Sequence, residues 1–274
     1  MTEPTSSQRR FTVIELPVLS IVKQSLILPF RHLPELVKFG GIPFLGILVV
    51  DAIAYMLARE DVAKSLPTLI LALGHFILFT PFCVAWSRLA ILGPASIANA
   101  PPFAYSRRAW LYLLASISMS ILLMICIGPG FILARYIQQT LDNRMGAEAA
   151  VLLLGGLFIF ALIFVRLAFI FPAIAIGRYA GISAAWRQTA GNLERLTAMI
   201  VLSYIPYFAV RRIFEWSMGY HPPGVVEAIR GCGDMLLVAL ATTAVAAPAL
   251  AYKTIVLDEA QATSAITESI RTNA

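Results

Sequence analysis

The chain has 274 residues, of which 59% are apolar and 13% are charged, about half the charged share of a soluble domain. This composition excludes a soluble globular domain, and nucleic acid is not expected as a partner, because the basic residues behind the net charge of +6 lie at the edges of apolar runs. The three cysteines lack the spacing of a zinc site or a disulfide framework. The sequence therefore predicts an all-α, polytopic integral membrane protein.

The N-terminal region contains a polar tail and then an amphipathic segment. Residues 1–12 predict a disordered cytoplasmic tail, which we expect to be retained because it lacks the apolar core and cleavage site of a signal peptide. Between Pro17 and Pro34, polar residues such as Lys23 and Gln24 fall on one helical face. This pattern fits a helix in the membrane interface and equally a helix packed on the bundle.

Long apolar runs follow, each sufficient to cross a hydrocarbon core of about 30 Å. They predict six transmembrane helices, at 39–58, 66–86, 110–134, 149–177, 196–213 and 235–257. No strand pattern competes with them, and only helices or closed barrels can span lipid. Residues 13–257 should therefore form one membrane domain, followed by a polar cytoplasmic tail at 258–274.

The distribution of Lys and Arg predicts the orientation. With the N-terminus in the cytoplasm, the cytoplasmic connections carry more Lys and Arg than the opposite connections. Arg211 and Arg212, between the fifth and sixth spans, run against this bias. We expect both termini to be cytoplasmic.

The fourth apolar run contains an arginine, in the stretch RLAFIFPAIAIGR at 166–178. As one helix the run would be roughly 43 Å long, more than the hydrocarbon core requires. A span that enters at its start reaches the cytoplasmic interface near Phe169, so Arg166 can extend to lipid phosphates, and Pro172 should kink or end the helix. Arg166 is either an interfacial anchor or a functional contact within the bundle.

A short interfacial helix is predicted over 182–190, because an apolar stripe recurs there at helical spacing. The stripe consists of Ile182, Ala185, Trp186 and Thr189. Gly191 should end this helix, and Asn192 is well placed to cap the fifth span.

A family resemblance rests on this region. The pattern is an arginine in an apolar run, Phe-Pro-Ala, a Gly-x-x-Ala-Ala-Trp-Arg helix and a Gly-Asn-x-x-Arg-Leu start of a new span. It occurs here at Arg166, Phe171, Pro172, Ala173, Gly181, Ala184, Ala185, Trp186, Arg187, Gly191, Asn192, Arg195 and Leu196. A similar stretch, VAWSRLAILG at 84–93, precedes the pair Arg107–Arg108. From about residue 39 onward the chain resembles the YciC-like family of six-span bacterial inner-membrane proteins, and the membrane domain fused to some glycerophosphodiester phosphodiesterases.

What the resemblance implies is a six-helix fold in the cell inner membrane of a bacterium. It implies no particular activity, because the YciC-like family is itself poorly understood. We looked separately for enzyme motifs and found no phosphate-binding glycine loop, His-Glu-x-x-His or Gly-x-Ser-x-Gly. We therefore expect a protein that is not an enzyme and needs no cofactor or metal.

Three polar residues within apolar runs form one candidate site. Asp51 in the first span and His75 in the second would lie at depths that differ by only ~3 Å in an antiparallel hairpin. A deep aspartate should pair or face a cavity, so Asp51, His75 and Arg166 are candidates for an intramembrane polar site that handles a proton or cation. The alternatives are a packing hydrogen bond, or two side chains that never meet.

Arginines at the cytoplasmic ends of the spans form a second candidate site, for anionic lipid head groups. They are Arg88, Arg107, Arg108, Arg178, Arg187 and Arg195. Small residues at four-residue spacing also predict close helix packing or dimerisation. They are Ser116 and Ser120 in the third span, and Ala239, Thr243 and Ala247 in the sixth.

Two functions fit these features. The first is a non-enzymatic accessory or lipid-associated membrane protein, with membrane lipids and either a membrane protein or a second copy of the chain as partners. The alternative is a small transporter or permease with a polar site in the bundle, to which proline-broken helices would contribute.

Overall fold

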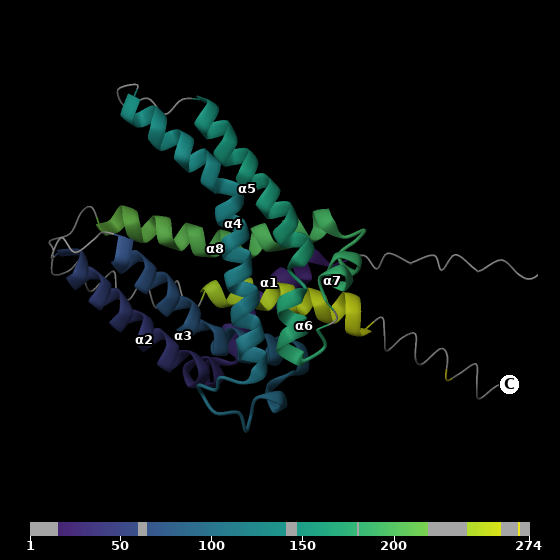
Figure 1. The fold of residues 1–274 in the computed structure, drawn as a ribbon. Helices are drawn as coiled ribbons and strands as arrows, with labels where there is room; N and C mark the ends of the chain where they lie inside the picture. Colours follow the sequence, from purple (N-terminus) through teal and green to yellow (C-terminus); the bar gives the residue numbers. More distant parts are fainter. Residues whose placement is uncertain are drawn as a thin grey trace, which may run out of the picture.

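The computed structural model describes residues 16–59, 65–140, 147–179, 181–218, 240–258 and 268 (Figure 1). Within these residues the regular elements are all helices, which confirms the predicted all-α fold. The predicted tail at 1–12 lies outside the described residues, as does nearly all of the predicted tail at 258–274.

The helices follow the apolar runs in chain order. They are α1 (Val18–Arg31), α2 (Leu33–Arg59), α3 (Ser65–Leu92), α4 (Arg107–Thr140), α5 (Ala147–Leu167), α6 (Ile170–Ile176), α7 (Ile182–Gln188) and α8 (Leu193–Met218). A short 3-10 helix, η1 (Pro94–Ser96), follows α3. A last helix covers residues 240–258 and includes a π-helical segment, η2 (Lys253–Leu257).

Five helical segments in the described residues are long and apolar enough to cross a membrane. They are Leu73–Leu92, Arg107–Tyr136, Ala150–Ile176, Leu193–Phe214 and Leu240–Leu257, and they correspond to the second to sixth predicted spans. The predicted first span lies in α2, where most side chains beyond Val50 are outside the description. The membrane-protein class is thus supported, and the count of six stays a prediction.

The helices extend beyond the predicted spans, as α8 and α4 show. The fifth span was expected to end near Ile213, but α8 continues to Met218, so Arg211 and Arg212 lie on the helix and not in a connection. The third span was expected to begin at Trp110, but α4 begins at Arg107. Apolarity marks the part of a helix that lies in lipid, and the helical backbone can extend beyond it.

The α1 helix packs on the bundle, which is one of the two alternatives left by its amphipathic pattern. One face of α1, which includes Ile21, Val22 and Ser25, is buried, and α1 packs on α8. Leu19 and Phe30 are exposed on its other side. The contact fits a pre-helix packed on the bundle, and a position of α1 in the membrane interface stays a prediction.

Glycines set the close approach within two helical hairpins. In α2–α3, a Cβ added at Gly46 would overlap Leu78, and one added at Gly74 would overlap Val50. In α4–α5, a Cβ added at Gly156 would overlap the backbone carbonyl of Cys126. Helices in lipid associate mainly by van der Waals packing, so such small residues allow the backbones to approach.

Pro172 breaks the fourth apolar run, as predicted, but the break lies upstream of the proline. The α5 helix ends at Leu167 and α6 begins at Ile170, because the ring of Pro172 would clash with the carbonyl of Ala168 in a continuous helix. The predicted span at 149–177 thus corresponds to the apolar segment Ala150–Ile176, which the break divides into α5 and α6. Gly177, with a φ of 78°, ends α6, and the Arg178 N–H donates to the Ala173 carbonyl at 2.8 Å.

The core lies toward one end of the bundle. Trp86, Phe169, Leu196, Met199 and Tyr252 are fully buried there. Figure 1 shows the α4–α5 hairpin rising from this core and standing apart from the α2–α3 hairpin. We call the region around these five buried residues the packed end. We call the parts of α4, α5 and α8 that diverge from it the outer halves.

The predicted small-residue face of the sixth span packs as expected. Ala247 and Thr243 are buried, and the Thr243 hydroxyl donates to the Ser203 carbonyl of α8 at 3.0 Å. Ala239 lies outside the described residues. Ser116 and Ser120 of α4 are half-buried, and their hydroxyls donate to carbonyls one turn earlier in their own helix.

Candidate functional site

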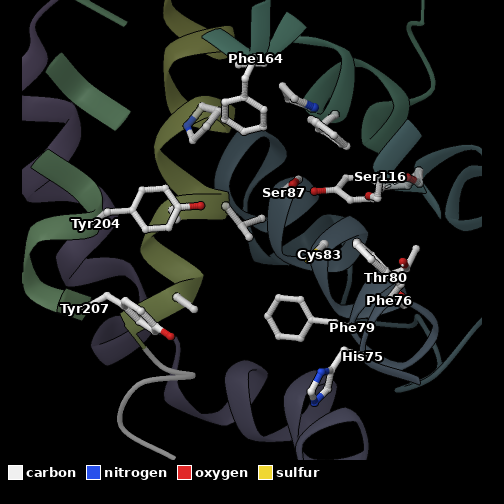
Figure 2. A pocket seen from close by; sticks show the side chains of 18 of the residues that line it. His75, Phe76, Phe79, Thr80, Cys83, Ser87, Ser116, Phe164, Tyr204 and Tyr207 are labelled. Atoms are coloured by element: carbon white, nitrogen blue, oxygen red, sulfur yellow. Dashed lines mark hydrogen bonds between the residues drawn. The ribbon is translucent and has the colours of Figure 1, made fainter. Parts of the chain in front are cut away.

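A cavity of about 690 Å³ lies between the helices (Figure 2). Its walls come from α2, α3, α4, α5, α6, α8, the turn between α5 and α6, and the last helix. The residues that line it are Ile47, His75, Phe76, Phe79, Thr80, Cys83, Ser87, Tyr112, Ser116, Phe164, Ala168, Phe171, Pro172, Tyr204, Tyr207, Ala241, Ala244, Val245 and Pro248. The volume falls in the ordinary range of small-molecule sites.

The walls are aromatic and aliphatic, with scattered hydroxyls. Among the described residues that line the cavity, none is Asp, Glu, Lys or Arg. Figure 2 shows Phe79 between His75 and Cys83 on one side, facing Tyr204 and Tyr207 on the other. Such a lining suits an apolar or amphipathic molecule, since an ion would need charged or strongly polar ligands.

The hydroxyl groups of the lining are mostly engaged within the protein. Thr80 donates to the Phe76 carbonyl at 2.6 Å, and Ser116 donates to the Tyr112 carbonyl at 2.9 Å. The buried phenol of Tyr112 interacts with Cys83 and Ser87. The hydroxyls of Thr80 and Ser116 therefore present mainly their lone pairs to the cavity, and the phenols of Tyr204 and Tyr207 add polar groups at the opposite wall.

Tyr105 donates a hydrogen bond to a carbonyl of α3 that Pro81 leaves without its helical partner. Pro81 has no N–H, so it leaves the carbonyl of Ile77 without its helical donor. The hydroxyl of Tyr105, in the loop before α4, donates to that carbonyl. Burial raises the pKa of Tyr105 above the usual tyrosine value, so the phenol stays a neutral donor near pH 7. The sequence shows that Pro81 frees a carbonyl but does not show which residue reaches it.

The three predicted polar residues do not all come together. His75 lines the cavity, as Figure 2 shows. Asp51 lies on α2, but its side chain is outside the described residues, so the contact between Asp51 and His75 stays a prediction. Arg166 is not part of the described lining.

Arg166 instead contacts the short helix α7. Its guanidinium carbon lies 5.3 Å from the centroid of the Trp186 ring, a cation–π geometry. The Thr189 hydroxyl also donates to the Arg166 carbonyl at 3.2 Å. Both partners belong to the stripe predicted for 182–190, and the two contacts fix α7 against the end of α5. Trp186 and Ile182 remain substantially exposed, as expected of a helix at an interface.

Asn192 has the position but not the bond of a helix cap. It precedes α8, and its backbone carbonyl accepts a hydrogen bond from the Leu196 N–H at 2.8 Å. Its side chain is buried, and its Oδ1 has no hydrogen-bond partner within the described part of the chain. The predicted side-chain cap is therefore not formed.

Two of the six predicted head-group arginines, Arg88 and Arg108, lie within electrostatic range of each other. The Arg108 guanidinium also lies against Gly177, where an added Cβ would be 3.1 Å from its Nε. Arg107 lies beside Arg108 in the first turn of α4, and Arg178 lies within electrostatic range of the Tyr252 hydroxyl. The remaining two, Arg187 on α7 and Arg195 on α8, belong to other elements.

Comparison with known proteins adds no relative: no family model, no curated protein and no solved structure matches the chain. The resemblance to YciC-like proteins therefore stays a prediction from the sequence. Among the described residues, no group of His, Cys, Asp or Glu is arranged to hold a metal ion. The cavity and the arginine pair beside it are the features on which a function can be argued.

Proposed function

We propose that this is a non-enzymatic, lipid-associated membrane protein whose cavity accommodates the apolar chain of a lipid. The observation that carries the proposal is the lining of the cavity, which is aromatic and aliphatic and free of Asp, Glu, Lys and Arg in its described residues. Phe76, Phe79 and Phe164 offer large apolar surfaces to a chain.

A chain that leaves the bilayer for this cavity gains little from the hydrophobic effect, since lipid is already apolar. Binding must instead come from packing against the walls and from contacts to the polar end of the lipid. A well-packed wall can supply the first contribution through many small dispersion contacts. The protein would then bind a lipid selectively without consuming it, as an accessory factor does.

Transport is the second candidate, and His75 favours it. An imidazole can both donate and accept hydrogen bonds, and His75 places one in the wall of the cavity. This function needs a polar partner at the same depth, and Asp51 is the residue expected to supply it. Transport therefore predicts that Asp51→Asn abolishes activity in cells without loss of expression, whereas lipid binding predicts no such loss.

We also place the protein in the bacterial inner membrane with both termini in the cytoplasm. The excess of Lys and Arg in the expected cytoplasmic connections supports this orientation. Reporter fusions at each terminus, one active only in the cytoplasm and one active only outside it, test the orientation directly. Two cytoplasmic termini require an even number of spans, so the same fusions also test the predicted first span.

A bulky side chain placed in the cavity tests whether the cavity binds a lipid chain. Ser116 lines the cavity, and Ser118, two residues along the same helix, is exposed. We expect Ser116→Phe to abolish the lipid that co-purifies with the protein in native mass spectrometry, and Ser118→Phe to leave it unchanged. Equal lipid retention by both variants would contradict the proposal.

A further inference from the structure

We propose that Arg88 and Arg108 bind the anionic head group, a phosphate in particular, of the lipid whose chain occupies the cavity. This inference rests on the proposed function and specifies the class of lipid. It selects two of the arginines at the helix ends as one binding site and connects that site to the cavity.

The first argument is that no salt bridge to either guanidinium group is found in the part of the chain that the structure describes. Arg88 and Arg108 are within electrostatic range and repel each other. The salt bridge found among the described residues is His32–Glu35, which involves neither arginine. Two like charges near each other are unfavourable unless an anion lies between or beside them, and a bound phosphate would supply that charge.

The second argument is that both groups are held in place. One terminal NH2 of Arg88 donates to the Ser96 carbonyl at 3.0 Å, while its Nε is buried without a hydrogen-bond partner in the described residues. Arg108 rests against Gly177, whose lack of a side chain and positive φ leave room for the guanidinium. Orientation before binding reduces the entropy that a ligand must overcome.

The third argument is the connection to the cavity. Ser87, next to Arg88, lines the cavity, and so does Tyr112, one helical turn after Arg108. Residues four apart on a helix lie on the same face, about 6 Å apart. The α6 helix contributes Pro172 to the lining and ends at Gly177 beside Arg108. The helices α3, α4 and α6 thus each contribute residues both to the cavity wall and to the surroundings of the arginine pair.

The chemistry of the pair favours phosphate over a neutral head group. A guanidinium presents parallel N–H donors that match two phosphate oxygens, and such charge-assisted bonds are roughly twice as strong as neutral ones. The described lining of the cavity carries no Lys or Arg, so the selectivity for an anionic lipid should depend on this pair.

The test uses the full chain in nanodiscs that contain equal amounts of phosphatidylglycerol and phosphatidylcholine with the same acyl chains. Native mass spectrometry then counts the lipids that stay bound. We expect wild type to retain the anionic lipid about tenfold over the zwitterionic one, and Arg88→Gln and Arg108→Gln each to remove most of that preference. Arg31→Gln, at an exposed arginine at the end of α1 outside the six candidate head-group contacts, is the matched control and should keep the preference.

The possible outcomes separate this inference from the proposed function. Equal retention of both lipids by wild type would overturn the head-group site and leave chain binding intact, whereas no bound lipid at all would overturn both. Free inorganic phosphate at millimolar concentration should not displace the lipid, and displacement would show that the pair binds a free anion. The wild-type selectivity needs no variant, so the test does not depend on whether a substituted chain folds.

Discussion

The packed end and the outer halves share long apolar runs but bury them to different extents. Phe169, at the packed end, is fully buried, whereas Phe158, three turns earlier in the same apolar run, is 65% exposed. In water the second arrangement would be costly, but in a bilayer the exposed face meets lipid chains at little cost. The apolar sequence therefore suits both regions to the membrane, whereas the arrangement of the helices determines which residues pack against protein. The cavity lies among helices that meet at the packed end and diverge beyond it.

The largest expected effect compares these two phenylalanines. Phe169→Ala should lower the free energy of unfolding by about 3–5 kcal/mol, because it leaves a void between α6 and the last helix, where Phe169 meets Tyr252 edge-on. Phe158→Ala should change it by less than about 0.5 kcal/mol. Denaturant-induced unfolding in one detergent measures both. Similar losses would show that the outer halves are also packed against protein.

The next effect tests a tight contact between α4 and α5 in the outer halves. Gly156→Ala should destabilise the protein by about 1–3 kcal/mol, because its Cβ would overlap the Cys126 carbonyl of α4. Gly155 has open space at the same position, so Gly155→Ala should be neutral or stabilising by up to about 1 kcal/mol. The same unfolding assay gives both values, and a destabilising Gly155→Ala would place an unseen neighbour on that face.

The smallest effect concerns the wall of the cavity. Tyr105→Phe removes the hydroxyl that donates to the Ile77 carbonyl and should cost about 1 kcal/mol. Burial raises the pKa of Tyr105 in the folded state, so folding favours the protonated phenol. The stabilisation is then complete below the unfolded pKa near 10 and is lost as pH rises through the folded value.

An unfolding series between pH 8 and pH 11 checks this sign. The difference in unfolding free energy between wild type and Tyr105→Phe should shrink as the pH rises. A difference that grows with pH would mean that the ionised phenol is the stabilised form, which the hydrogen bond to a carbonyl forbids.

Much of the fold could be predicted from the sequence. Apolar length identified the helices, Pro172 identified the break between α5 and α6, and the spacing of Ala185 and Thr189 identified α7. These signals are local, because each depends on residues within one or two helical turns.

The site could be predicted only in part, because its residues come from many elements. A helix that is apolar on all sides gives no sign of which face meets a neighbour. His75 was found because it is a polar residue in an apolar run, but Phe79 and Tyr204 look like any other membrane-facing aromatics. Arg166 was found for the same reason as His75, and its partner Trp186 could be assigned only once α7 was placed against α5.

The most direct test of the lipid-binding cavity is photo-crosslinking in nanodiscs with a lipid that carries a diazirine in its acyl chain. Peptide mapping should find the lipid on lining residues such as Phe79 as well as on exposed residues such as Phe158. With Ser116→Phe, the label on the lining should disappear and the label on the outer face should remain. Label confined to the outer face in wild type, or a lining signal that Ser116→Phe does not change, would contradict the account.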